Sequence, residues 1–124
     1  MATVLVLEDD EDNLLVLEAA LEMQGFSVRC ARSCAEAEAA LREGGVDALV
    51  SDYSLADCNA VDWLRALGDR RPRVALLVTG HGEPEAREAS RAAGFAAHLV
   101  KPIAPADLER QLRTALAMAD APAR

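Results

Sequence analysis

The chain has 124 residues, of which 52% are hydrophobic, and a formal net charge of −8 at pH 7. This length predicts a single domain with its own core, and we expect residues 3–119 to form it and residues 120–124 to be a frayed tail. The acidic balance argues against direct binding to nucleic acid or to a membrane surface. No apolar run approaches the roughly 20 residues that a membrane span needs.

The amino terminus and the cysteines indicate the compartment. The first apolar run has no basic residue before it and meets acidic residues at once, which is not the pattern of a secretory signal. Three cysteines are an odd number without the spacing of a metal site. They predict a reduced, cytoplasmic protein whose small thiols are buried packing residues. These cysteines are Cys30, Cys34 and Cys58.

The first predicted element is the strand Thr3–Leu7, a continuous apolar run of strand length. A helix follows it, which Asp12 or Asn13 is expected to cap and Gly25 to end. Phe26–Cys30 is predicted as the second strand.

The second helix begins at a clear signal, because Ser33 is followed three residues later by Glu36, as in a capping box. The pair Gly44 and Gly45 ends this helix. The third strand is predicted at Asp47–Ser51.

The second half of the chain repeats the same alternation. Asn59 opens a third helix, and the all-aliphatic run Val74–Val78 is the fourth strand. A helix from about Glu83 to Ala93 precedes the fifth strand, Ala96–Val100. Pro105 then begins the last helix, since proline is favoured at the first helical position.

Strands and helices therefore alternate five times. Strands that are apolar along their whole length are covered on both faces, which is typical of a parallel sheet between helices. The fold class is predicted as α/β, a doubly wound (βα)5 sheet of five parallel strands. Ligands of such sheets bind beyond the carboxyl ends of the strands.

Polar side chains follow four of the predicted strands. Glu8 and Asp9 come after the first strand, Asp52 after the third, Thr79 after the fourth and Lys101 after the fifth. A parallel sheet would gather all of them at one edge. Clustered carboxylates suit a hard divalent cation such as Mg²⁺. A cation and a lysine together could neutralise a phosphoryl group, for which an aspartate can act as the nucleophile.

With these motifs in this order, the sequence resembles the receiver domains of two-component response regulators over essentially its whole length. The resemblance implies a flavodoxin-like, CheY-like fold with the strand order 2-1-3-4-5. The matching segments are Glu8-Asp9 after LVL, Asp52 in LVSDYSL, Thr79-Gly80 in LLVTG and Lys101-Pro102 in LVKPI.

The resemblance also implies a role for each residue around the metal. Asp52 would accept a phosphoryl group from a phosphohistidine in a reaction that depends on Mg²⁺. Asp9, Asp52 and the backbone carbonyl of Ser54 would bind Mg²⁺ directly. Glu8 would act on the ion through a bound water molecule.

Further roles concern the phosphoryl group and signalling. Thr79 and Lys101 would hold the phosphoryl oxygens, and Thr79 and His98 would act as switch residues. The implied partners are a histidine kinase or a histidine phosphotransfer protein. An effector protein or output domain would bind the face made by the helix after Thr79, the fifth strand and the last helix, and the resemblance allows a homodimer.

Three positions depart from the family pattern. Ala56 stands where the family commonly has proline, and Ala60 where it has glycine, so the loop after Asp52 is expected to be less rigid or to turn differently. His98 stands where the switch residue is usually aromatic, and its charge can vary near neutral pH.

The resemblance implies a phosphoacceptor signalling domain, which catalyses at most its own phosphorylation and dephosphorylation and is otherwise not an enzyme. Three alternative functions remain open. A receiver-like scaffold that takes no phosphate would fit the two alanines. A phosphatase with an aspartate nucleophile would need an Asp-x-Asp pair after the first strand. A flavodoxin-like electron carrier would need a hydroxyl- and glycine-rich loop there, where this chain has five acidic residues from Glu8 to Asp12.

Overall fold

A computed structural model describes residues 1–80 and 84–120 of the chain. One sheet of five parallel strands has the order β2-β1-β3-β4-β5, which confirms the predicted fold class and strand order. The strands are β1 Thr3–Leu7, β2 Ser27–Ala31, β3 Ala48–Ser51, β4 Val74–Thr79 and β5 Ala97–Val100. The helices are α1 Glu11–Met23, α2 Cys34–Glu43, α3 Ala60–Leu67, α4 Pro84–Ala93 and α5 Pro105–Ala119, with a 3-10 turn at Gly68–Arg70.

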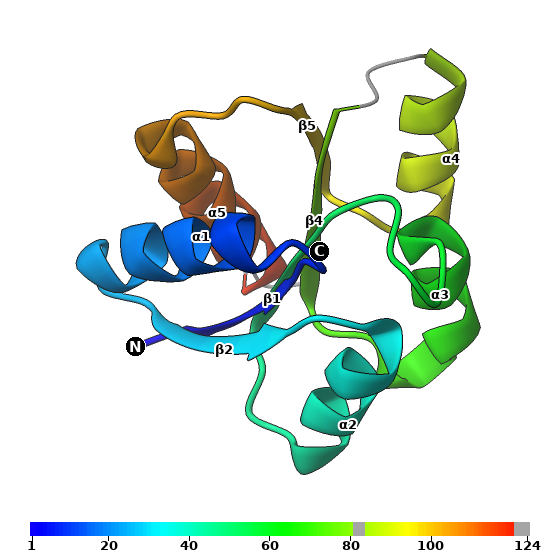
Figure 1. Cartoon of the computed structure of the whole chain (residues 1–124), viewed down its shortest axis with the longest axis horizontal. Coiled ribbons are helices and arrows are strands. Elements are labelled where there is room, and N and C mark those ends of the chain that lie inside the picture. Colours follow the sequence, from blue (N-terminus) through cyan, green and yellow to red (C-terminus); the bar gives the residue numbers. More distant parts are fainter. Residues whose placement is uncertain (81–83, 121–124) are drawn as a thin grey trace.

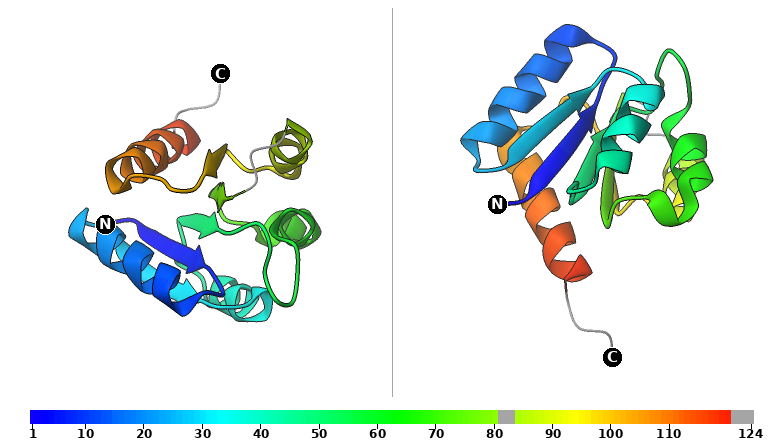
Figure 2. Two further views of the ribbon diagram at one scale, coloured as in Figure 1. Left: turned by 45° about the horizontal axis from the view of Figure 1, so that its top comes forward. Right: turned by 90° about the horizontal axis from the view of Figure 1, so that it is seen from below.

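The sheet is the middle of three layers. Helices α1 and α5 cover one face, and α2, α3 and α4 cover the other, as two further views confirm (Figures 1 and 2). Alternate residues of β1 serve the two faces: Leu5 and Leu7 pack toward α2 and α3, whereas Val4 and Val6 pack toward α1 and α5. All four are fully buried. Each such side chain stabilises the fold by about 1.5–3 kcal/mol relative to exposure.

The starts of α1 and α2 follow the capping rules, with one correction. Asp10 caps α1, because its backbone is extended and its carboxylate accepts a hydrogen bond from the backbone N–H of Asp12 at 3.0 Å. The expectation that Asp12 or Asn13 caps this helix was therefore wrong, since both are already helical. Ser33 caps α2 as predicted, accepting from the backbone N–H of Glu36 at 3.1 Å.

Three strands begin one residue later than predicted. Phe26 precedes β2 but is only 4% exposed, so its side chain fills the core without joining the strand. Asp47 precedes β3, and its carboxylate accepts a hydrogen bond from the backbone N–H of Thr3 at 2.8 Å. Ala96 likewise precedes β5. The fourth helix begins at Pro84, and its predicted start, Glu83, lies outside the described residues.

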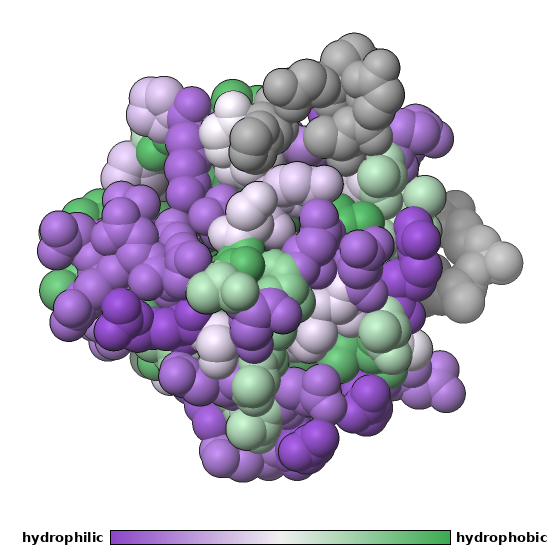
Figure 3. Space-filling model, turned by 45° about the vertical axis from the view of Figure 1, so that its right-hand side comes forward, coloured by the Kyte–Doolittle hydropathy of each residue, from purple (hydrophilic) through white to green (hydrophobic). Residues whose placement is uncertain are grey.

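The surface mixes polar and apolar side chains. On the face turned toward α3 and α4, hydrophobic residues form small patches between polar ones (Figure 3). Among the described residues, no helix combines the length and the hydrophobicity needed to cross a membrane. Asp120 follows α5 and its carboxylate pairs with Arg73, while the remainder of the predicted tail, residues 121–124, lies outside the described residues.

Candidate functional site

Strand register brings two acidic segments together at the carboxyl edge of the sheet. Leu7, the last residue of β1, pairs with Ser51, the last residue of β3. The residues that follow, Glu8 and Asp52, therefore leave the sheet side by side. The ladder continues one step further, because the backbone N–H of Asp52 donates to the carbonyl oxygen of Leu7 at 3.0 Å. Both carboxylates are thus anchored by regular backbone structure.

The other two strand ends carry Thr79 and Lys101 to the same edge. Thr79 ends β4 and pairs with Val100, which ends β5. The backbone N–H of Lys101 donates to the carbonyl oxygen of Thr79 at 2.8 Å, so the lysine leaves the sheet beside the threonine. Thr79 is 1% exposed.

Three carboxylates converge at this edge. One oxygen atom from each of Glu8, Asp9 and Asp52 lies within 4.8 Å of the others. Glu8 is 2% exposed, while Asp9 and Asp52 are half-buried and border solvent. Oxygen ligands at this separation and of this charge fit a hard divalent cation, and an open side leaves room for the water that Mg²⁺ retains.

Lys101 supplies positive charge to this cluster. Its Nζ lies 3.0 Å from Oε1 of Glu8 and 3.6 Å from Oδ1 of Asp52. Burial alone would lower the pKa of Lys101, but the hydrogen bond to Glu8 and the charge of Asp52 outweigh it and raise that pKa. Burial raises the pKa of Glu8, and the hydrogen bonds from Lys101 and from the backbone of Asp10 oppose this only in part. One ammonium against three carboxylates leaves an excess of negative charge.

Ser54 and His98 are the two remaining predicted site residues. Ser54 is exposed on the loop between β3 and α3, where it forms an isolated bridge with Asn59. His98 is half-buried in β5, where it pairs with Leu77 of β4. The structure therefore brings Glu8, Asp9, Asp52 and Lys101 together, with Thr79 beside Lys101. Ser54 and His98 lie on neighbouring segments.

The loop after Asp52 is ordered by hydrogen bonds although it lacks proline and glycine. The backbone N–H of Leu55 donates to the carbonyl oxygen of Cys58 at 3.0 Å, and that of Ala60 donates to Tyr53 at 2.9 Å. Ala60 is the first residue of α3, which Asn59 caps, and the described non-glycine residues have no positive φ. Alanine at the position of the family's glycine is therefore accommodated by ordinary helical backbone.

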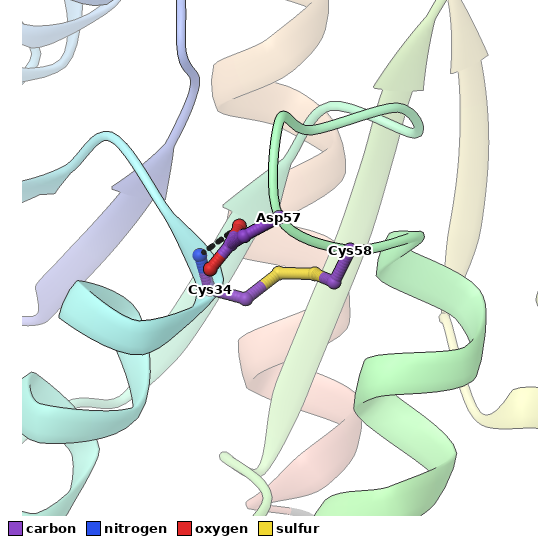
Figure 4. Close-up of side chains that lie close together, drawn as sticks. All are labelled: Cys34, Asp57 and Cys58. Atoms are coloured by element: carbon purple, nitrogen blue, oxygen red, sulfur yellow. Dashed lines mark hydrogen bonds between the residues drawn. A yellow bond between two sulfur atoms is a disulfide. The ribbon is translucent and has the colours of Figure 1, made fainter.

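One feature of this loop was not predicted from the sequence. Cys34, the first residue of α2, forms a disulfide with Cys58, and Asp57 points at the same helix end (Figure 4). The expectation of three buried, reduced thiols was wrong, since Cys30 is exposed and the other two are joined. A signal was available: Cys34 follows the second strand and Cys58 the third, which places both at the carboxyl edge.

Asp57 completes the attachment of this loop to α2. Its carboxylate accepts hydrogen bonds from the backbone N–H groups of Cys34 at 2.9 Å and of Ala35 at 3.2 Å. These hydrogen bonds lower the pKa of Asp57, the bond from Cys34 most of all. Because the first N–H groups of a helix lack partners within the helix, the carboxylate stabilises the start of α2. Possible metal-ligand atoms of Cys34, Asp57 and Cys58 also lie close to one another. The two cysteine sulfur atoms are bonded to each other, however, so they are not thiolate ligands in this structure.

Comparison with known proteins gives one consistent family. The family model of the response regulator receiver domain matches residues 4–113. The photosynthetic apparatus regulatory protein RegA of Cereibacter sphaeroides is 34% identical over 101 residues, which are 81% of this chain and 55% of that protein. The sensory/regulatory protein RpfC of Xanthomonas campestris is 31% identical over 110 residues, which are 85% of this chain and 15% of that protein. This chain therefore spans only part of the length of both relatives.

A solved structure agrees with these sequence relatives. The crystal structure of a CheY-like response regulator receiver domain protein from Methanospirillum hungatei superposes with a TM-score of 0.90 at 26% identity. The match covers 97% of this chain and 97% of that one.

Proposed function

Because the chain belongs to the response regulator receiver domain family, we propose that Asp52 accepts a phosphoryl group from a phosphohistidine of a sensor kinase or phosphotransfer protein. The observation that carries the proposal is the cluster of three carboxylates facing the single ammonium of Lys101. Such a cluster suits a site that takes up a divalent cation and a phosphoryl group together. A structural ion pair alone would not need the two additional carboxylates.

The chemistry requires one nucleophile and charge compensation. A carboxylate oxygen of Asp52 attacks the phosphorus atom, the P–N bond to the donor imidazole breaks, and the imidazole keeps the electron pair. The ammonium of Lys101 and the hydroxyl of Thr79 bind the phosphoryl oxygens, whose negative charge would otherwise repel the carboxylates. When bound, Mg²⁺ supplies further positive charge. Asp9, Asp52 and the carbonyl of Ser54 would hold it, with Glu8 acting through water.

We also propose where the domain acts, which residues transmit its state and which surface binds its partners. Residues 3–119 act as one cytoplasmic receiver unit, and Thr79 and His98 transmit the phosphorylated state. The face made by α4, β5 and α5 binds an effector protein or output domain and can support a homodimer. The position of His98 supports this assignment. His98 lies in β5, and Lys101 directly follows the end of that strand, three residues after His98.

Incubation with Mg²⁺ and a small-molecule phosphodonor tests the proposal. We expect intact-protein mass spectrometry to detect one acid-stable, base-labile phosphate on the wild type, and none on the Asp52→Asn variant or without Mg²⁺. An equal adduct on Asp52→Asn would contradict the assignment. A protein that binds Mg²⁺ but takes no phosphate would instead be a receiver-like scaffold.

A further inference from the structure

The loop that follows Asp52 is tied to a neighbouring helix by a covalent bond. The Cα atoms of Cys34 and Cys58 are 6.3 Å apart, within the range over which a disulfide forms without backbone movement. Cys34 is 4% exposed at the start of α2, whereas Cys58 is half-buried on the loop. Cys58 is therefore the more exposed of the two cysteines.

This tie acts on the segment next to the nucleophile. The loop from Tyr53 to Asn59 begins at the residue after Asp52 and contains neither proline nor glycine. Tyr53 itself donates its backbone N–H to Oδ1 of Asp52 at 2.8 Å, so a shift of the loop start moves the carboxylate. The loop also carries Ser54, whose carbonyl is a proposed Mg²⁺ ligand. Its attachment to α2 includes the disulfide and the two hydrogen bonds of Asp57.

We propose that Cys34 and Cys58 form a thiol–disulfide redox site that sets how fast Asp52 takes up a phosphoryl group. This inference rests on the function proposed for Asp52. With the disulfide closed, the loop is held in place and Asp52 is preorganised. With the disulfide open, the loop loses its covalent tie to α2 but keeps the two hydrogen bonds of Asp57, and it samples more conformations.

The redox step is an exchange with a low-molecular-weight disulfide such as glutathione disulfide. One cysteine thiolate attacks that disulfide, forms a mixed disulfide and releases one thiol. The second cysteine thiolate then attacks the protein sulfur of the mixed disulfide and releases the second thiol. The two cysteines lose two electrons and two protons, and the glutathione disulfide is reduced to two thiols. Excess reduced glutathione reverses the exchange.

Cys30 provides an internal control for this chemistry. It is exposed on the edge strand β2 and is not part of the disulfide. Desolvation of its thiol, together with the negative charges of Glu18 and Glu22, raises the pKa of Cys30 to about 11. Little of it is thiolate near neutral pH, so it is a poor partner for exchange.

The test compares the oxidised and reduced forms of the whole chain, prepared in defined ratios of glutathione disulfide to glutathione. Alkylation and mass spectrometry count the free thiols, and the initial rate of phosphorylation by a small-molecule phosphodonor is measured with Mg²⁺. We expect the oxidised form to react about tenfold faster than the reduced form. The Cys30→Ala variant should keep this difference, and the Cys34→Ala/Cys58→Ala variant should lose it.

Equal rates for the oxidised and reduced wild type would overturn the inference, as would a difference that persists in Cys34→Ala/Cys58→Ala. If neither form takes up phosphate, the proposed function fails instead. In that case, amide hydrogen exchange of the oxidised and reduced protein still tests whether the disulfide holds the loop. Unchanged protection of residues 53–59 on reduction would show that it does not.

Discussion

The ammonium of Lys101 lies 3.0 Å from Oε1 of Glu8, although these residues are 93 positions apart in the sequence. Glu8 is 2% exposed, and the lysine is its only cationic partner among the described residues. Lys101 also lies 3.6 Å from Oδ1 of Asp52. The lysine thus links the buried acid to the proposed nucleophile, and it offsets part of the charge that both bring to the strand ends.

The buried carboxylate of Glu8 should make the metal-free protein less stable as the pH rises. Burial raises the pKa of Glu8, so the folded chain binds this proton more tightly than the unfolded chain does. Its contribution to the free energy of unfolding therefore falls as the pH rises from the ordinary pKa of 4.5 through the raised value. We expect Glu8→Gln to be more stable than the wild type at neutral pH. The ammonium of Lys101 would not be left unpaired in this variant, because Asp52 still provides a negative charge beside it.

Urea unfolding in the presence of a chelator measures this effect from about pH 4 to about pH 7. The stability gain of Glu8→Gln over the wild type should grow with pH. A difference that is constant over this range would mean that Glu8 does not titrate as described.

The acidic residues after β1 should divide into metal ligands and helix residues. Asp9→Ala removes a proposed direct ligand, so Mg²⁺ affinity should fall by more than the roughly 10–100-fold that loss of an outer-shell group causes. Glu11→Ala, in the first turn of α1, should change the affinity little. Isothermal titration calorimetry compares the two variants, and similar losses would mean that the cluster acts only through its overall charge.

The cap of α1 should contribute measurably to stability. Asp10→Ala removes the acceptor for the backbone N–H of Asp12 and should lower the free energy of unfolding by about 1 kcal/mol. Asp10→Asn keeps an oxygen acceptor at the same place and should be nearly neutral. Denaturant unfolding without divalent cations separates this effect from metal binding. Equal losses for both variants would point to the charge of Asp10 instead of its capping bond.

The strands and the acidic edge could be predicted because they depend on local pattern. Val74–Val78 is apolar throughout, since both of its faces are covered, and the strand formed there. In a parallel sheet all carboxyl ends meet at one edge, so strand-end residues such as Asp52 and Lys101 could be grouped before any contact was known. Asp10 was missed as a cap because Asp12 and Asn13 are equally good cap residues by type.

Features that depend on the path of a loop could not be predicted in the same way. The sequence separation of 24 between Cys34 and Cys58 does not reveal whether the sulfur atoms meet, because this depends on how the loop after β3 folds toward α2. Ala56 and Ala60 suggested a looser loop, but backbone hydrogen bonds, the disulfide and Asp57 hold it. These tertiary contacts involve residues distant in sequence, so the local pattern of the loop could not predict them.

The position of the phosphoryl group can be determined chemically. After reaction with a small-molecule phosphodonor and Mg²⁺, borohydride reduces an aspartyl phosphate to homoserine, which peptide mass spectrometry can assign to one position. We expect homoserine at Asp52 alone, in amounts that depend on Mg²⁺ and fall strongly in Lys101→Ala. Modification at Glu8 or Asp9 instead of Asp52, or no modification in a folded protein that binds Mg²⁺, would contradict this expectation.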